Sequence, residues 1–317
     1  MKKKLLHIMM GQGNPDLKRG FDSVFDCVHL DWIPFQDRIS HLQDEILRMY
    51  HSFEPDAIFM HIQSGDVVFP NTASYLMKKS MVFSWTGDVR YPLPQHYIDM
   101  GRCITSTLFS NETDVDIARS AGIKADYLQV GFDKEHFSPL GRIDKKYSDI
   151  IFLGTNYITT PFPLTHLRQE LGMRLKAEFG NNFQIYGNGW GALSNGVITN
   201  YEEEGTAYRS CKIAINLSHF AYKRYSSDRM FRILGSGAFC LTHRFPDIDK
   251  DFEVGKELVV WENLDDLINK CRYYLHYSQE RERIALNGCF KARTEYTWNN
   301  FALNLNKIIN NYKNQNQ

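Results

Sequence analysis

The sequence predicts an α/β protein built from two doubly wound domains. The first observation is that short apolar strands alternate with amphipathic helical patterns along the chain, which is typical of βαβ units around a parallel sheet. The second is a polar, turn-rich stretch, Pro139–Ser148, within 317 residues, a length that suits two domains. We therefore expect one domain over residues 1–143, a second over residues 149–296, and a last helix and tail over residues 297–317.

The composition indicates an ordinary globular protein and argues against one that binds bulk nucleic acid. Hydrophobic residues make up 43% and charged residues 23%, which is ordinary for soluble domains. Lys+Arg and Asp+Glu both number 37, whereas proteins that bind bulk nucleic acid are usually more basic. The 6 cysteines lack C-x-x-C spacing, so we expect reduced thiols and no zinc site. Because no bilayer-length apolar run or signal peptide is visible, we expect a cytoplasmic protein.

Six strands and three helices are expected in the first domain. The strands are Lys4–Met10, Cys27–Trp32, Ala57–Ile62, Met81–Thr86, Cys103–Phe109 and Tyr127–Val130, and the helices are Asp37–Phe53, Thr72–Lys78 and Glu112–Ala121. The first strand runs into a loop that contains Gly11 and Gly13, where glycine would allow a ligand to approach the backbone. The loop does not match G-x-G-x-x-G, so a plain β–α turn is an equal alternative.

Polar residues follow three strands of the first domain. His61 ends one strand, Asp88 and Arg90 follow the next, and Asn111 follows a third. Because parallel strands end at one edge of a sheet, these residues predict a site there. We expect Asp88 to act on an acceptor group as a base, with His61 as the competing base and with Arg90 and Asn111 as acceptor contacts. The alternative is that Asp88 caps a turn and pairs with Arg90.

An Asp-x-Asp sequence, Asp114-Val115-Asp116, lies inside an expected helix. Residues two apart on a helix point in different directions. We therefore expect these carboxylates to diverge and not to hold a metal.

The most informative stretch of the second domain runs from Ile213 to His243. It consists of a buried strand, a polar and basic loop, a short helix ended by Gly-Ser-Gly, and a second buried strand. Ser227 or Asp228 is expected to cap the helix, because Ser and Asp are good N-cap residues. The first helical turn then offers unpaired N–H groups beside Arg229, which predicts an anion site at the end of a strand.

The remaining second-domain elements follow the same alternation. Expected strands are Asp149–Leu153, Phe183–Tyr186 and Leu258–Trp261, and expected helices are Leu167–Phe179, Tyr201–Cys211, Leu264–Tyr277, Gln279–Lys291 and, last, Thr297–Tyr312. The first two strands run into Gly154 with Asn156 and into Gly187. Glycine at a strand end allows a nucleotide to meet the backbone.

The order strand, S-x-R-x-F-x-x-x-x-x-G, strand resembles the donor half of the GT-B glycosyltransferases. It is most similar to the spore-maturation CgeB-type group, with its R-x-F-E-x-x-x-x-G, and the match falls on Arg229, Phe231 and Gly235 or Gly237. The segments W-T-G-D-V-R, S-N-E-T and Y-L-Q-V-G-F-D-K-E-H-F-S-P resemble the acceptor domain of the same group, in the expected order.

The resemblance implies the GT-B architecture, in which two Rossmann-like domains face each other across a cleft and the last helix crosses back to the first domain. It implies transfer of a sugar from a nucleotide-sugar, most often a UDP-sugar, to an acceptor hydroxyl, with retention and with no metal or other cofactor. The acceptor could be a glycan, a small molecule or a modified DNA base. The donor contacts it implies are Gly11, Gly13, Gly154, Asn156, Gly187, Lys223, Arg224, Ser227, Arg229, Ser236 and Gly237.

The chain departs from the family at Arg232, where the group has a Glu that accepts hydrogen bonds from the donor. Arginine cannot accept a hydrogen bond, so Glu253 or Glu257 is a candidate for the ribose. This departure leaves a non-catalytic nucleotide-sugar-binding protein as one alternative. A glycosyltransferase acting on DNA is another; the neutral charge argues against it, and a basic face on the first domain would favour it.

Overall fold

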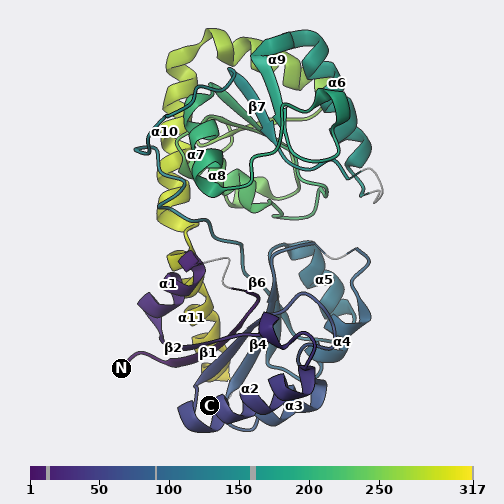
Figure 1. Cartoon of the computed structure of the whole chain (residues 1–317), viewed down its shortest axis with the longest axis vertical. Coiled ribbons are helices and arrows are strands. Elements are labelled where there is room, and N and C mark those ends of the chain that lie inside the picture. The colour runs from purple at the N-terminus through teal and green to yellow at the C-terminus, as the bar shows by residue number, and fades with distance from the viewer. Residues whose placement is uncertain (12–14, 90, 158–161, 316–317) are drawn as a thin grey trace. The chain divides into compact units, whose positions relative to one another are not determined.

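The computed structural model describes residues 1–11, 15–89, 91–157 and 162–315 (Figure 1). Contacts divide the chain into two units: unit 1 comprises Met1–Gly131 with Trp298–Gln317, and unit 2 comprises Phe132–Thr297. Each unit is a parallel sheet with helices on both faces, as Figure 1 shows. Of the helices described, none is long and apolar enough to cross a membrane.

Unit 1 contains a parallel sheet of six strands in the order β2-β1-β3-β4-β5-β6. The strands are β1 Lys4–Met9, β2 Asp26–Asp31, β3 Ala57–His61, β4 Met81–Thr86, β5 Ser106–Phe109 and β6 Ala125–Tyr127. The helices are α1 Pro15–Val24, α2 Ile39–Phe53, α3 Pro70–Leu76, α4 Gln95–Gly101, α5 Glu112–Ser120 and α11 Trp298–Gln315, with a 3-10 turn, η1, at Ile33–Phe35.

Alternate residues of the unit 1 strands supply its two cores. Leu6 and Ile8 face the apolar side of α2 and α3, whereas Phe59 packs on the other face against Phe21 of α1 and Phe301 of α11. A Cβ at Gly20 would lie 2.6 Å from the carbonyl oxygen of Trp298, so glycine lets α1 meet α11 backbone to backbone. The last helix thus packs on the first sheet, as predicted.

Unit 2 contains a parallel sheet of five strands in the order β11-β10-β9-β7-β8. The strands are β7 Ile150–Leu153, β8 Phe183–Tyr186, β9 Ile213–Asn216, β10 Cys240–His243 and β11 Val259–Trp261. The helices are α6 Thr165–Phe179, α7 Tyr201–Ser210, α8 Asp228–Gly235, α9 Leu264–His276 and α10 Ser278–Glu295, with 3-10 turns η2 Gly180–Asn182, η3 Gly191–Leu193 and η4 Ile248–Lys250.

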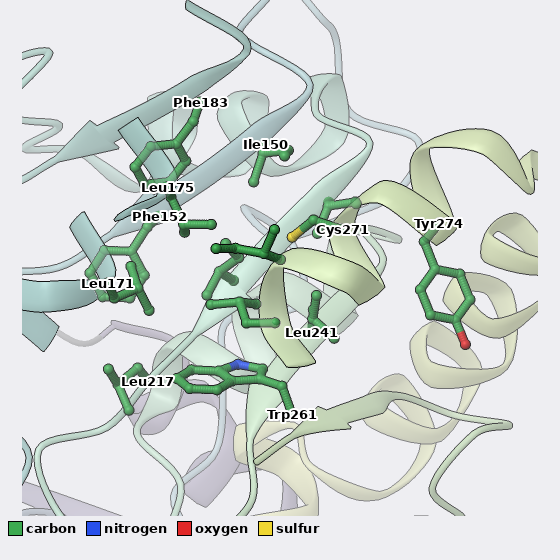
Figure 2. Close-up of a cluster of buried hydrophobic side chains, with 14 of the residues drawn as sticks. Ile150, Phe152, Leu171, Leu175, Phe183, Leu217, Leu241, Trp261, Cys271 and Tyr274 are labelled. Atoms are coloured by element: carbon green, nitrogen blue, oxygen red, sulfur yellow. The ribbon is translucent and has the colours of Figure 1, made fainter. Parts of the chain in front are cut away.

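One core of unit 2 lies between its sheet and helices α6 and α9 (Figure 2). Leu171 and Leu175 of α6 meet Phe152 of β7, and Cys271 of α9 lies in the same cluster. Trp261 of β11 is fully buried there. This packing holds the strands in place, and the loops that follow their carboxyl ends are positioned with them.

The predicted α/β class with two doubly wound sheets is confirmed, and the deviations are local. Helices α1 and α4 were not predicted. The segment of α1 contains Gly20, and the residues just before α4 are rich in proline. The sixth strand ends at Tyr127 instead of starting there. The chain leaves the sheet after it, and the carbonyl of Leu128 accepts a hydrogen bond from the indole of Trp85 at 3.0 Å. The fifth strand starts at Ser106, three residues later than expected.

Candidate functional site

The loops after β7 and β8 meet through glycine. Gly187 has a φ of 140°, and a Cβ on it would lie 2.4 Å from the carbonyl oxygen of Gly154. A Cβ on Gly154 would in turn lie 2.8 Å from Nη2 of Arg229 and 3.1 Å from Nη1 of Arg168. Glycine at the end of β7 therefore lets two guanidinium groups approach the backbone, and a nucleotide contact at Gly154 or Gly187 remains a prediction.

Arg168 and Arg229 reach the same point from different helices. Arg168 lies in α6 and is fully buried, and Arg229 lies in the first turn of α8. Both donate to the carbonyl oxygen of Leu217, Arg229 at 3.2 Å, and Arg229 also reaches Oδ1 of Asn216 at 3.4 Å. Their guanidinium carbons lie 5.3 and 5.6 Å from the ring centre of Phe152. Two positive charges thus share one corner beyond β7 and β9.

Neither charge has an ion-pair partner in the described part of the chain. Among the residues that the structure describes, no carboxylate forms an ion pair with Arg168 or Arg229. Burial, followed by the charge of Arg229, lowers the pKa of Arg168 well below its usual value. Burial, followed by both arginines, lowers the pKa of His219 to about 3. A buried cation without a counter-charge is costly, so this corner favours an anion.

Several buried polar atoms around the two arginines also lack a partner in the described part of the chain. They are Oδ1 of Asn156, Nε of Arg168, Nδ1 of His219 and Oγ of Ser227. The amide of Asn156 is held in place because its Nδ2 donates to the carbonyl of Gly189 at 3.0 Å. Buried polar groups are normally paired, so these atoms are available to a polar ligand.

Helix α8 starts where the sequence predicts. It begins at Asp228 with Ser227 as its N-cap, and the Ser227 side chain makes no capping bond. Lys223 is exposed in the preceding loop. Arg224 is engaged elsewhere: its guanidinium pairs with both carboxylate oxygens of Asp251, at 2.9 and 2.5 Å. Arg224 therefore has a structural partner that the sequence did not indicate.

Ser236 and Gly237 lie at the opposite end of α8 from Ser227. Ser236 is the C-cap and is buried, and Gly237 has a φ of 77°. The rise per residue of an α-helix places Ser236 roughly 10 Å along the axis from Arg229. The structure therefore does not bring this predicted pair to the arginine corner.

Arg232, at the family's Glu position, ties α8 to α7. It pairs with Glu204 of α7 at 3.1 Å and with Asp228 at 2.5 Å, and it lies over the ring of Tyr201 at 4.5 Å. Burial raises the pKa of Glu204 from its usual value, with the charge of Arg232 opposing it. Arg232 is thus part of a half-buried ion-pair network that joins two helices.

The two carboxylates that the sequence offers for a ribose make local contacts. The Glu257 carboxylate accepts the backbone N–H of Glu253 at 2.8 Å, and Glu253 pairs with Lys256 at 2.8 Å. A ribose contact from either remains a prediction.

In unit 1, the two candidate bases follow neighbouring strands. His61 ends β3 and pairs in register with Trp85 of β4, and their rings lie edge to face 4.9 Å apart. Asp88 is exposed two residues beyond β4, where its backbone N–H contacts the hydroxyl of Thr86 at 3.3 Å. The sheet order therefore places both side chains at the carboxyl ends of adjacent strands.

Other predicted contacts of unit 1 serve local structure. Asn111 is fully buried and caps α5: its Oδ1 accepts the N–H of Asp114 at 2.7 Å, and its Nδ2 donates to the Asp114 carboxylate at 2.8 Å. The N–H of Gly11 donates to Asp31 at 2.8 Å. Gly13 and Arg90 lie outside the described residues. Asp114 is buried and Asp116 exposed, so these carboxylates diverge as expected.

Comparison with known proteins identifies the fold. A family model described as glycosyl transferase-like matches residues 167–307. No curated protein sequence matches the chain significantly. Among solved structures, Anabaena HepE in complex with UDP and glucose is 10% identical, with a TM-score of 0.66 over 98% of this chain and 100% of its own. The chain has the GT-B fold of glycosyltransferases.

Two further structures show the same GT-B fold. Sucrose-phosphate synthase from Thermosynechococcus elongatus is 7% identical, with a TM-score of 0.66 over 98% of this chain and 99% of its own. A glycosyltransferase from Rickettsia africae is 10% identical, with a TM-score of 0.63 over 98% of both chains. The CgeB-type subgroup remains a prediction.

Arg168 is the residue of the arginine corner that no sequence motif indicated. It lies in α6, 15 residues after the last residue of β7, and outside any motif quoted above. One signal was available: with Leu164, Leu171 and Leu175 it falls at i, i+4, i+7 and i+11 on the apolar stripe of its helix. A lone arginine in such a stripe must be buried with polar partners.

Proposed function

We propose that this GT-B protein transfers a glycosyl group from a nucleotide-sugar, with UDP-sugars as the first choice, to an acceptor hydroxyl. The observation that carries the proposal is the pair of guanidinium groups, Arg168 and Arg229, beyond the carboxyl ends of β7 and β9 with no carboxylate partner among the described residues. A diphosphate is the anion that fits two adjacent arginines best, because guanidinium binds phosphate oxygens in a forked geometry. HepE, which shares the fold, was solved with UDP and glucose.

The two arginines would act on the leaving group. As the bond to the anomeric carbon breaks, negative charge builds on the nucleoside diphosphate. Fixed cations stabilise that charge, and the N–H groups of the first turn of α8 add to their effect. Two such cations supply the stabilisation for which other enzymes use a metal ion, so we propose a metal-independent reaction.

Unit 1 would supply the acceptor side of the reaction. Asp88 is our candidate for accepting the hydrogen bond of the acceptor hydroxyl, and His61 is the alternative base. We propose retention of the anomeric configuration, in keeping with the family resemblance. The anomeric proton coupling in the NMR spectrum of the product tests this directly: an inverted product would overturn retention and leave the transfer itself intact.

The central experiment is a donor screen. The full chain is incubated with UDP-, GDP- and ADP-sugars and an acceptor mixture, and released nucleoside diphosphate is measured. We expect release with one nucleotide class. Arg174, which lies on α6 with Arg168 but pairs with Asp265, gives a matched control, Arg174→Ala. Thermal stabilisation by a donor without any release of nucleotide would instead indicate a binding protein.

A DNA-modifying activity is not favoured. A basic hollow of 590 Å³ does lie on unit 1 and is lined by Lys3, Lys78, Lys79, Lys124 and Lys313. It also contains Asp56, Met81 and Thr105, which come directly before or at the start of strands β3, β4 and β5. His61 and Asp88 lie at the other ends of these strands, so a base bound in the hollow would not reach them.

A further inference from the structure

Three potential metal ligands come together on unit 1, away from the carboxyl ends of its strands. Cys27 and His29 are two apart on β2, so their side chains share one face of the sheet. Asp22 lies in the last turns of α1, the helix that precedes β2. One ligand atom from each residue lies within 4.8 Å of the others. A single ion can therefore contact a thiol, an imidazole and a carboxylate at this point.

The imidazole of His29 is held at both of its nitrogens. Nε2 lies 2.8 Å from Oδ1 of Asp22, and Nδ1 lies 3.0 Å from Nδ1 of His7. His7 is its register partner on β1 and is 1% exposed, between the rings of Phe21 and Phe59. A buried partner on the far nitrogen is the usual support of a metal-binding histidine, because it fixes the ring and the tautomer.

We propose that Asp22, Cys27 and His29 form a site for Zn²⁺ or a closely related divalent cation. Thiolate, imidazole and carboxylate are the zinc ligand types, and zinc is commonly bound by three side chains with water in the fourth position. The Asp22 side chain is 48% exposed, so ion and water can enter. His29 would bind through Nε2 and donate its Nδ1–H to Nδ1 of His7.

The alternative is a plain hydrogen-bonded cluster. In such a cluster the Cys27 sulfur keeps its proton and no ion lies between the three side chains. A bound cation would displace this proton, because a coordinating thiol is deprotonated. The two states therefore differ in a directly observable bond between metal and sulfur.

The site would stabilise unit 1 without taking part in transfer. Cys27 pairs in register with Leu5, near the start of β1, whereas the candidate acceptor groups follow the ends of β3 and β4. The ion would link α1 to β2, and α1 in turn packs on α11 through Gly20. Failure of the metal proposal would thus leave the proposed glycosyl transfer untouched, and the reverse also holds.

The test uses the full chain, dialysed against a chelator and then titrated with Co²⁺ or Zn²⁺. We expect one equivalent of Co²⁺ to bind with a sulfur-to-cobalt charge-transfer band, and Zn²⁺ to displace it and raise the melting temperature. Cys27→Ser should abolish the band and weaken binding by more than the roughly 10- to 100-fold that loss of a supporting partner causes. Cys103→Ser, which changes another partly buried thiol of unit 1, should behave as the unchanged protein.

Two results would overturn the site: no stoichiometric uptake by the unchanged chain, or equal uptake by Cys27→Ser. If Cys27→Ser fails to fold, Asp22→Asn gives the same test at an exposed position. It should fold normally and lose affinity. His7→Gln should retain the charge-transfer band and lose roughly 10- to 100-fold in affinity, as expected of a positioning residue.

Discussion

The two units share one architecture but use the carboxyl ends of their strands differently. In unit 2, Arg168 and Arg229 converge beyond β7 and β9 without a carboxylate among the described residues to pair with them. In unit 1, Asn111 and Gly11 are satisfied by their own surroundings, as the N-cap of α5 and as a donor to Asp31. Polar residues at a strand end can therefore either form a binding site or complete the hydrogen bonds of a local turn.

The difference teaches that buried polar atoms without hydrogen-bond partners indicate a ligand site better than the mere presence of polar residues at a strand end does. The atoms without partners around Arg168 include Oδ1 of Asn156 and Nδ1 of His219. Leaving such groups unpaired costs stability, and a ligand would recover that cost. In unit 1, the proposal of a reactive residue rests on His61 and Asp88, which follow neighbouring strands.

The largest expected effect comes from removing Arg229. Arg229→Ala should lower turnover by roughly two to three powers of ten, the scale for losing one stabiliser of transition-state charge. The fold should survive, because in the described part of the chain the side chain donates hydrogen bonds to just two oxygens, the Leu217 carbonyl and Oδ1 of Asn216. Initial rates on folded protein, verified by circular dichroism, check this. Near-normal turnover would show that Arg229 does not stabilise the leaving group, and the strand ends of unit 2 would then not differ from those of unit 1 by an anion site.

The next largest effect tests whether unit 1 has a reactive residue at all. Asp88→Asn should leave folding and donor affinity unchanged while transfer falls by roughly 10²-fold or more. Single-turnover rates and donor titration separate the two quantities. Loss of stability with an intact rate per folded molecule would make Asp88 a turn residue and transfer the role of base to His61.

Arg168 should affect donor binding more than folding. Arg168→Met keeps an apolar stem in the α6 stripe and removes a buried charge, whose loss need not destabilise. Because charge-assisted hydrogen bonds are worth about 1.5–3 kcal/mol, UDP affinity should fall roughly 10- to 100-fold. Calorimetric titration, with Arg174→Ala as the control, measures this. Unchanged affinity would restrict the anion site to Arg229.

The smallest expected effect is a dependence of stability on pH that arises from the protonation of His219. Its pKa in the folded chain is lowered to about 3 from 6.5, so below pH 6.5 the unfolded chain binds more protons than the folded chain. The contribution of His219 to stability is therefore complete above pH 6.5 and is lost as the pH falls toward 3. Melting temperatures between pH 7.5 and 5 should decline less in His219→Gln than in the unchanged chain. Parallel curves would show that His219 lies in a more open environment.

Much of the fold could be predicted because it depends on local pattern. Apolar runs located the strands β1 to β11 except β6, which overlaps the predicted strand only at Tyr127, and Ser227 followed by Asp228 marked the start of α8. The elements that were missed, α1 and α4, owe their helicity to packing more than to propensity. Gly20 in α1, for example, is unfavourable locally but is required by the contact with Trp298.

The sequence by itself determined the two parallel sheets, the strand ends that carry polar groups and the start of α8 with Arg229 in its first turn, because periodicity and capping act over a few residues. Tertiary structure alone decided which side chains contact each other. It paired Arg224 with Asp251, placed Arg232 against Glu204, and brought Arg168 to Arg229. It also collected Asp22 and His29 around a thiol that lacks any metal-binding spacing. Charge pairing and ligand geometry depend on distance in space, and that distance is set by packing between elements far apart in the chain.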